Sequence, residues 1–315
     1  MISILIPIYN VDVTNLVNNL LEQIHAQDLP HSSDHPYELI MLDDASPDDN
    51  IRRKNASLSE NQEVTYLQNQ TNRGRSATRN LLVQHAQNDL LIMMDCDASV
   101  ASPTYLKQYT DFLQAHPTLP TRFVVSGGLV YRGDKPEYAR RLRWKYGQKR
   151  ECRLAKERNQ APYKSFTPFN ILISRSTFEH NGFDESFDSY GYEDTFWGYQ
   201  LQQQQIPVIH IDNPLFHDGL DTNEQFLQKT RTAIANLARL MDENRIPDQF
   251  WEESSLLRTY RYFQKRGLLP LCRLCYHMLH FPMEWWLHTF PTLRLLDAYK
   301  LFCLAKMSKL QNSGV

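Results

Sequence analysis

The chain has 315 residues, of which 42% are hydrophobic, and this length suits one large domain or one domain with an appendage. Its formal net charge of −2 argues against a protein whose general role is to bind nucleic acid. No uncharged apolar run reaches the roughly 18 residues that a membrane-spanning helix needs, which argues against an integral membrane protein.

The cysteines predict a reducing environment. There are five, and an odd number in so long a chain does not suggest a disulfide framework. Cys272 and Cys275 form a CxxC pair with apolar neighbours, which is more typical of a core helix than of a metal or redox site. Because the first residues have a strand pattern and not that of a signal peptide, we expect a cytoplasmic protein.

Strand and helix patterns alternate through residues 1–100. Apolar runs predict strands at residues 2–8, 37–42, 64–67 and 90–94, and helical spacing predicts helices at residues 11–24 and from the turn at 72–76 to about residue 86. Strands and helices in this order are typical of an α/β protein with a doubly wound, mostly parallel sheet. Such sheets bind ligands at the carboxyl ends of their strands.

Acidic residues follow two of these strands. Asp95 and Asp97 come directly after the apolar run 90–94, and they share one face if the backbone stays extended. Two such carboxylates can hold a divalent cation that in turn binds a diphosphate, or they can belong to an ordinary acidic turn. Asp43 and Asp44 end the second strand, where they form a turn, cap the next helix, or accept hydrogen bonds from a nucleobase or ribose.

A series of motifs resembles glycosyltransferase family 2, whose members have the GT-A fold. The motifs occur in the family's order and spacing: Pro7-Ile8-Tyr9-Asn10, Leu42 to Asp48, Asn72-Arg73-Gly74 with Ala77 to Asn80, Met94 to Asp97, Asn181 to Glu185, Gly191 to Asp194, and Pro214 to His217.

The resemblance predicts the domain organisation. It covers residues 1–220, which are expected to form a GT-A catalytic domain with a Rossmann-like nucleotide-binding half (1–100) and an acceptor-binding half (101–220). Residues 221–315 are expected to form a helical C-terminal extension, since residues 223–241 have the pattern of an amphipathic helix.

The resemblance also implies a nucleoside-diphosphate sugar as the donor. The expected nucleotide-binding residues are Pro7, Tyr9, Asn10, Asp43, Asp44, Asn72, Gly74, Arg79 and Asp95. Asp43 and Asp44 remain alternatives for the contact with the base. A UDP-linked donor is expected at the level of the family, in which guanosine and deoxythymidine donors also occur.

A divalent cation, Mn²⁺ or Mg²⁺, is the cofactor that the resemblance implies. Asp97 and Asp95 are the expected carboxylate ligands and His217 the expected histidine ligand, with His210, inside an apolar run, as its competitor. The resemblance makes Asp194 the general base that takes a proton from the acceptor hydroxyl, and it makes Glu193 a residue that positions the acceptor. One such base fits transfer with inversion.

One stretch departs from the family pattern. Where the family has a glycine-containing loop that faces the donor sugar, this chain has Ser165 to Asn170, without glycine. We expect Pro168 and Phe169 to narrow the sugar pocket.

Two segments are strongly basic. Residues 132–164 contain twelve basic and four acidic residues. The basic side chains line a groove for an acidic acceptor, or they form a solvated helix face.

Residues 258–315 contain nine basic and two acidic residues, and 258–309 mix arginine and lysine with aromatic side chains. This second pattern suits a membrane surface, or helices packed on the catalytic domain or in a homodimer. The membrane alternative would place the protein at the inner face of the cytoplasmic membrane.

The leading hypothesis is a metal-dependent, inverting transferase that moves a sugar to a glycan or lipid-linked acceptor in cell-surface polysaccharide synthesis. A nucleotidyltransferase would need a glycine-rich phosphate loop, which Tyr9 to Asp12 do not provide. A catalytically silent nucleotide-sugar binding protein or scaffold would be expected to lack the base, whereas Asp194 is present.

Overall fold

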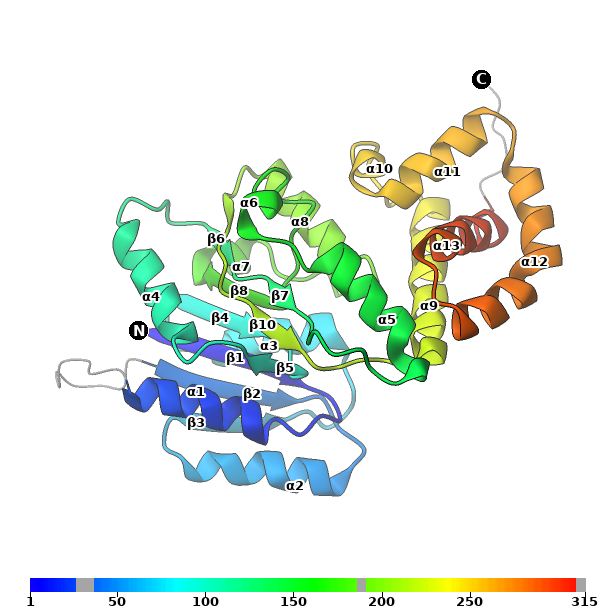
Figure 1. Cartoon of the computed structure of the whole chain (residues 1–315). Coiled ribbons are helices and arrows are strands. Elements are labelled where there is room, and N and C mark those ends of the chain that lie inside the picture. The colour runs from blue at the N-terminus through cyan, green and yellow to red at the C-terminus, as the bar shows by residue number, and fades with distance from the viewer. Residues whose placement is uncertain (27–36, 186–190, 310–315) are drawn as a thin grey trace. The chain divides into compact units, whose positions relative to one another are not determined.

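The computed structural model describes residues 1–26, 37–185 and 191–309 (Figure 1). The strands are β1 (Ile2–Ile8), β2 (Tyr37–Asp43), β3 (Val64–Gln68), β4 (Leu90–Met94), β5 (Ala98–Val100), β6 (Val124–Ser126), β7 (Leu129–Val130), β8 (Asn170–Ser174), β9 (Val208–His210) and β10 (Leu215–His217). The longer helices are α1 (Thr14–Ala26), α2 (Asp49–Ser57), α3 (Arg75–His85), α4 (Tyr105–Ala115), α8 (Glu193–Gln203), α9 (Asn223–Asp242), α11 (Ser255–Lys265), α12 (Leu269–Thr289) and α13 (Leu293–Met307). Short helices are α5 (Arg141–Tyr146), α6 (Ala155–Arg158), α7 (Arg175–His180), α10 (Phe250–Glu253), and the 3₁₀ or π turns η1 (Leu58–Glu60), η2 (Tyr138–Arg140) and η3 (Gly147–Glu151).

The central sheet has seven strands in the described part of the chain, in the order β3-β2-β1-β4-β8-β6-β9. Pairs β1–β2, β1–β4, β2–β3 and β6–β9 are parallel, whereas β8 is antiparallel to β4 and β6. The predicted doubly wound, mostly parallel α/β sheet is therefore confirmed, with the four strands expected in residues 1–100 as neighbours.

The sequence pattern of β1 and β4 explains their central position. Their apolar runs are almost completely buried, as a strand covered on both faces requires. Helix α3 packs on β1 and β2, and α1 lies beside α4. Each fully buried leucine or isoleucine of this core stabilises the fold by about 1.5–3 kcal/mol.

A second, three-stranded sheet has the order β5-β10-β7. Strand β10 is antiparallel to β5, and its register places Leu215 opposite Val100 and His217 opposite Ala98. This pairing connects residues that are far apart in the sequence.

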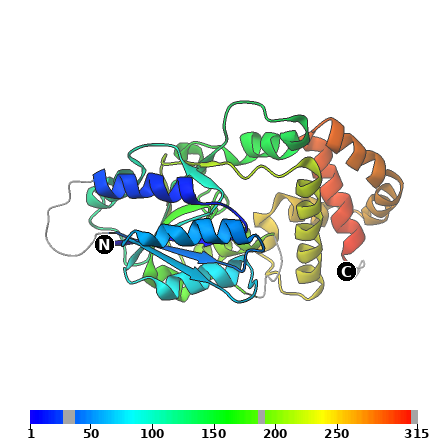
Figure 2. The same cartoon turned by 90° about the horizontal axis from the view of Figure 1, so that it is seen from below.

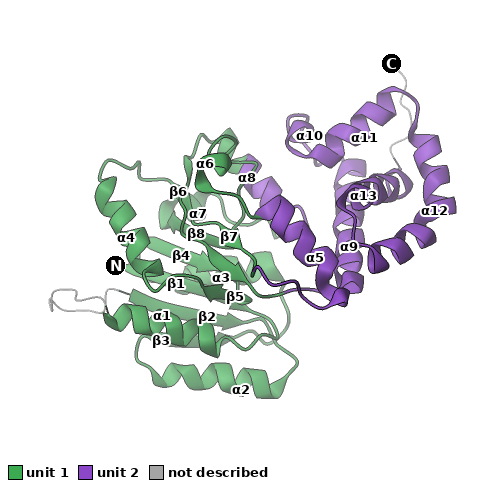
Figure 3. Ribbon diagram, viewed as in Figure 1, with its two compact units in different colours: residues 1–132, 152–185, 200–219 green, residues 133–151, 186–199, 220–315 purple. Residues whose placement is uncertain are grey.

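The chain divides into two compact units, which we describe separately (Figure 3). The first unit contains residues 1–132, 152–185 and 200–219, and therefore both sheets. The second unit contains residues 133–151, 186–199 and 220–315. The expected boundary near residue 220 stays a prediction.

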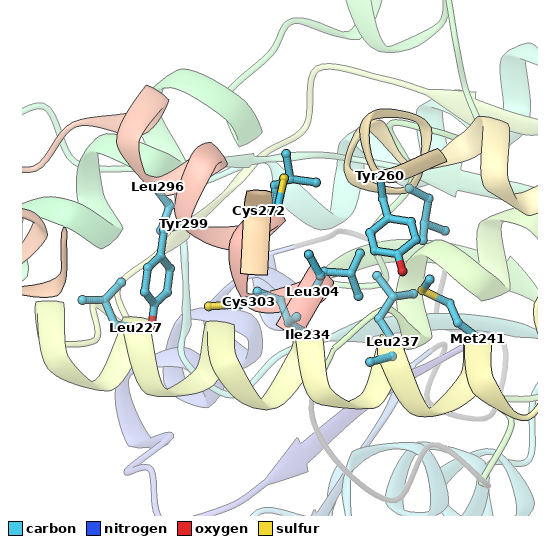
Figure 4. Close-up of a cluster of buried hydrophobic side chains, with 14 of the residues drawn as sticks. Leu227, Ile234, Leu237, Met241, Tyr260, Cys272, Leu296, Tyr299, Cys303 and Leu304 are labelled. Carbon is cyan, nitrogen blue, oxygen red and sulfur yellow. The ribbon is translucent and has the colours of Figure 1, made fainter. Parts of the chain in front are cut away.

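The second unit is helical and has its own apolar core. Helix α9 begins with a capping box between Thr222 and Gln225, and it runs beside α13, the red helix next to the yellow one in Figure 2. Figure 4 shows the buried cluster that these two helices form with α11 and α12. It includes Leu227, Ile234, Leu237, Met241, Tyr260, Cys272, Leu296, Tyr299, Cys303 and Leu304. Cys272 is thus a core residue, as its apolar neighbours suggested.

Several basic residues of 132–164 have partners within this unit. Arg143 forms an ion pair with Glu151 (3.0 Å) and Arg150 one with Asp297 (2.6 Å). Lys145 donates to the carbonyl of Pro291. These side chains help to hold helices together, and the hypothesis that they all line an acceptor groove loses support.

Within the described residues, no helix combines the length and the apolar character needed to cross a membrane.

Candidate active site

The backbone turns directly after β4. The N–H of Ala98 donates to the carbonyl of Asp95 at 3.2 Å, so the chain does not stay extended through Asp97. The condition under which Asp95 and Asp97 would share one face, a backbone that stays extended, is therefore not met. The two carboxylates instead have different neighbours.

Asp95 is bound by an arginine from α3. Nη2 of Arg79, a side chain that is 3% exposed, donates to Oδ1 of Asp95 at 2.5 Å, and its guanidinium lies 5.0 Å from the centre of the Phe183 ring. Burial raises the pKa of Asp95, but the charges of Arg79 and Arg75 outweigh this effect and the pKa is lowered. Asp95 is therefore an ionised carboxylate.

Asp97 lies beside His217. The pairing of β10 with β5 sets His217 opposite Ala98, the residue after Asp97, and Nδ1 of His217 lies 3.9 Å from Oδ2 of Asp97. The N–H of Asp218 donates to the carbonyl of Asp97 at 3.0 Å. The structure thus brings together two of the three predicted metal ligands, which are far apart in the sequence of the first unit.

Two aromatic rings hold the imidazole of His217. Phe169 stacks on one side at 5.0 Å and 3°, and Tyr131 also stacks on it at 5.2 Å and 16°. Phe169 is 3% exposed and supports the ring of the histidine. The expectation that Pro168 and Phe169 narrow the sugar pocket stays a prediction. Stacking of this kind fixes the plane of the ring.

Gly219 makes room for Asp97. A Cβ atom at Gly219 would lie 2.0 Å from Oδ2 of Asp97, which is closer than any real contact. With glycine at this position, the backbone after β10 passes the carboxylate without displacing it.

The residues at this strand end fit a divalent cation in part. Among the described residues, no group of three or more His, Cys, Asp or Glu side chains already has the arrangement of a metal site. Asp97 nevertheless offers a carboxylate oxygen, a ligand type that suits Mn²⁺ and Mg²⁺, and His217 offers a ring nitrogen beside it. Asp95 lies at the same strand end, but its Oδ1 is occupied by Arg79.

Asp43 and Asp44, at the end of β2, fasten neighbouring loops. Asp43, which is 0% exposed, accepts the N–H of Ser46 at 2.7 Å. The carboxylate of Asp44 accepts the side-chain amide of Asn69 and the N–H groups of Arg73 and Gly74, each at 2.8 Å. Asp43 thus belongs to a turn, as one of the alternatives predicted, whereas Asp44 binds a loop that is distant in the sequence. The choice between them for a base contact stays a prediction.

The loop from Asn72 to Gly74 begins helix α3. Gly74 has φ +84°, and Oδ1 of Asn72 accepts its N–H at 3.1 Å. Asn80 connects α3 to the Asn181 to Glu185 motif, since its side-chain amide donates to the carbonyl of Phe183 and to Glu185.

The segment after β1 places an aromatic side chain at the surface. Pro7 is the penultimate residue of β1, and Tyr9, which follows the strand, is 52% exposed. Asn10 has φ +55°, and its N–H donates to Oγ of Ser46 at 2.7 Å, so the loops after β1 and β2 are joined. The aromatic ring of Tyr9 is thus exposed at this edge of the sheet.

His210 has a structural role. It is 3% exposed, its Nδ1 lies 2.7 Å from Nη1 of Arg158, and its Nε2 lies 2.9 Å from the carbonyl of Pro162. Burial lowers the pKa of His210 to about 4. Because both ring nitrogens are used internally, His217 is the better candidate for a ligand.

Glu193 and Asp194 belong to the second unit, in the first turn of α8. Glu193 is 9% exposed and its Oε2 accepts the N–H of Gly191 at 2.6 Å. Gly191 has φ +113°, and a Cβ there would lie 2.3 Å from Cβ of Ala233 in α9. The motif therefore fixes the entry into α8, next to Asp194.

Sequence reasoning missed the supports of the site. Tyr131, Phe169 and Gly219 belong to no motif of the sequence. Only Phe169 stands out, because it lies in the stretch that lacks the family's glycine. In the sequence Arg132 is only part of a basic segment, whereas in the structure it donates to both oxygens of Asp218, next to His217. The pKa of Asp218 is lowered because hydrogen bonds from Arg132 and Ser99 outweigh the effect of burial.

The mostly parallel sheet and the carboxylates at the carboxyl ends of its strands are the features expected of an enzyme with a GT-A fold. A protein-family model described as glycosyl transferase family 2 matches residues 3–182, more than half of the chain. The chain therefore belongs to glycosyltransferase family 2, whose members are sugar-transferring enzymes, and the resemblance seen in its motifs is confirmed.

Curated relatives match part of the chain. An uncharacterized glycosyltransferase of Haemophilus influenzae is 31% identical over 122 residues, which are 37% of this chain and 44% of the relative. The poly(ribitol-phosphate) beta-glucosyltransferase of Bacillus spizizenii is 28% identical over 109 residues, 34% of this chain and 16% of the relative. The chain spans less than half the length of these relatives.

A solved structure resembles the whole chain. The mannosyltransferase PcManGT from Pyrobaculum calidifontis, in complex with GDP-Man and Mn²⁺, is 16% identical, and the match covers 97% of this chain and 85% of that protein with a TM-score of 0.55. This likeness shows a shared fold.

Proposed function

We propose that this protein transfers a sugar from a nucleoside-diphosphate sugar to a hydroxyl group of a glycan or lipid-linked acceptor, with the help of a divalent cation and with inversion, in polysaccharide synthesis. The observation that carries the proposal is the juxtaposition of Asp97 and His217 at the carboxyl end of β4, 3.9 Å apart. Membership of the family supports the reaction class.

The donor nucleotide would lie along the edge formed by β1, β2 and β4. Tyr9 would stack on the base, and the loop held by Asp44 would contact the nucleotide through Asn72 and Gly74. Asp95, oriented by Arg79, would accept hydrogen bonds from the ribose. These roles rest on the resemblance and on the common position of these residues at one sheet edge.

Asp97 and His217 would hold the cation. A bound Mn²⁺ or Mg²⁺ supplies the positive charge that stabilises the leaving diphosphate. The protein's own contribution is to keep the two ligands in place, through the stacking of His217 and the close approach of Gly219.

Asp194 would take the proton of the acceptor hydroxyl. It lies in the first turn of α8, behind a loop that Glu193 holds through Gly191. Because Glu193 is nearly buried, we propose that it positions this loop and thereby Asp194, and only indirectly the acceptor.

A UDP-linked sugar is our first choice of donor, on the basis of the family-level expectation. The name of the Bacillus spizizenii relative, a beta-glucosyltransferase acting on poly(ribitol-phosphate), is consistent with a polysaccharide product. GDP-linked sugars are the main alternative, since the Pyrobaculum mannosyltransferase was solved with GDP-Man.

The test is a thermal melting screen of the full chain with UDP-glucose, UDP-N-acetylglucosamine, GDP-mannose and dTDP-glucose, each with Mn²⁺ or with EDTA. A ligand that binds only the folded protein raises the melting temperature. We expect one nucleotide to stabilise the protein in the presence of Mn²⁺ and much less with EDTA. If no nucleotide sugar changes the melting temperature under either condition, the proposal is wrong.

A further inference from the structure

Helix α12 has a second apolar face besides the one that joins the core of the second unit. Its inner face buries Leu269, Cys272, Met283 and Leu287. On the outer face of the helix, the side chains point into solvent: Met278 is 67%, Phe281 73% and Trp285 62% exposed. Exposed apolar side chains gathered on one element mark an interaction surface, whereas single ones need no explanation.

The exposed side chains form a continuous stripe. Leu271, Leu274, Met278, Phe281 and Trp285 follow each other at intervals of three or four residues, which is the spacing of one helix face. Leu279, Trp286 and Phe290 are exposed next to them. From Leu271 to Phe290 the stripe is roughly 28 Å long at 1.5 Å per residue.

Positive charges lie at both ends of this stripe. Lys265 and Arg266 precede α12, and Arg294 follows it in the first turn of α13. All three are exposed, and none forms an ion pair within residues 1–26, 37–185 and 191–309.

The acidic residues of the same segment are already neutralised. Residues 258–309 contain only Glu284 and Asp297 as acids. Glu284 is paired with Arg231 at 2.8 Å and also accepts the Tyr299 hydroxyl, and Asp297 is paired with Arg150 at 2.6 Å. The stripe is therefore flanked by uncompensated positive charge.

We infer that the outer face of α12 binds the surface of a membrane that contains anionic phospholipids. Tryptophan and phenylalanine side chains would enter the headgroup region, and Lys265, Arg266 and Arg294 would contact lipid phosphates. A second copy of the chain fits less well, because it would bring further positive charge to this face and residues 258–309 offer no unpaired carboxylate to match it.

The experiment is sedimentation of the full chain with vesicles of phosphatidylcholine alone or mixed with phosphatidylglycerol. We expect binding to the anionic vesicles that weakens at high salt. Met278→Glu should weaken it at least tenfold, whereas Leu154→Glu, which replaces an equally exposed side chain (65%) in the first unit, should leave it unchanged.

The positive charges have their own matched pair of variants. Lys265→Ala with Arg266→Ala should weaken binding by roughly tenfold or more at low salt, because each basic residue near an anionic surface contributes about 1 kcal/mol. Lys156→Ala, at an exposed lysine of α6 in the first unit, is the control. Melting curves of all variants check that they remain folded.

A measurement on the unaltered protein does not depend on any variant. Quenching of tryptophan fluorescence by brominated lipids should occur with anionic vesicles, since Trp285 and Trp286 would lie among the headgroups. The inference is wrong if the protein binds no vesicles, or if Met278→Glu and Leu154→Glu behave alike. It is also wrong if light scattering shows a dimer that Met278→Glu dissociates, while neither protein binds lipid.

Discussion

The imidazole of His217 lies 3.9 Å from the carboxylate of Asp97, although the two residues belong to strands and loops that are far apart in the sequence. If this pair holds a cation, replacing either residue should weaken binding of the cation without unfolding the protein. Asp97→Ala should abolish the Mn²⁺-dependent rise in melting temperature with UDP, and His217→Ala should raise the Mn²⁺ concentration that is needed. His210→Gln serves as the comparison, and an equal effect of His210→Gln would contradict the assignment.

Gly219 offers a way to disturb Asp97 without changing it. In Gly219→Ala the new methyl group would overlap Oδ2 of Asp97, so the carboxylate must move. We expect a loss of Mn²⁺-dependent nucleotide binding with a small change in the melting temperature of the protein alone. Gly133→Ala, where a Cβ would meet nothing within 4 Å, is the control, and equal behaviour of the two variants would show that this approach is unimportant.

Asp194→Asn should separate binding from transfer. An amide cannot accept the proton of the acceptor hydroxyl, and loss of a general base typically lowers turnover by roughly 10²–10⁴-fold. Stabilisation by UDP and Mn²⁺ should persist, and release of UDP in the presence of acceptor should fall. Glu224→Gln, an exposed residue at the start of α9, should leave both unchanged. Undiminished turnover of Asp194→Asn would place the base elsewhere.

Asn170 should be a strong determinant of stability. Its Oδ1 accepts the hydroxyls of Tyr105 and Tyr109, both at 2.7 Å, and its amide donates to the carbonyls of Gly128 and Asn213. Asn170→Ala would remove all four of these buried hydrogen bonds, and each buried group that is left unsatisfied costs about 1–3 kcal/mol. Chemical unfolding should therefore show a loss of about 3 kcal/mol or more, whereas Asn19→Ala on the exposed side of α1 should change the free energy of unfolding by roughly 0.5 kcal/mol or less.

His210 predicts a pH dependence of stability. Its pKa is about 4 in the folded protein, against 6.5 for an unperturbed histidine. Between these pH values the unfolded chain protonates this histidine and the folded protein does not. The free energy of unfolding is therefore at its full value above pH 6.5 and decreases as the pH falls towards 4. The full loss would be roughly 3 kcal/mol. Unfolding experiments across this range should show a flatter profile for His210→Gln than for the exposed control His85→Gln.

The sequence predicted those parts of the molecule that depend on local patterns. Apolar runs gave the central strands, and the acidic residues that follow them gave the edge where the site lies. The condition for a shared face of Asp95 and Asp97 is not met at the turn, because alternation of side chains holds only while the backbone stays extended. Nothing in the local pattern showed that Ala98 would hydrogen-bond back to Asp95.

Residues whose role depends on the packing of distant segments could not be predicted in this way. The carboxylate of Asp44 binds the loop of Asn69 to Gly74, and Phe169 stacks on His217, because the tertiary structure brings these segments together. The choice of His217 over His210 came from the resemblance to the family. The structure adds a physical reason, since both ring nitrogens of His210 have internal partners.

The antiparallel pairing of β5 and β10 limits how this chain can vary in length. Since successive side chains in a strand point to opposite faces, one residue inserted between Pro214 and His217 would turn the imidazole away from Asp97. Insertions in surface loops between these two strands leave the register untouched. Natural length variation among close homologues should therefore spare β10 and accumulate in those loops.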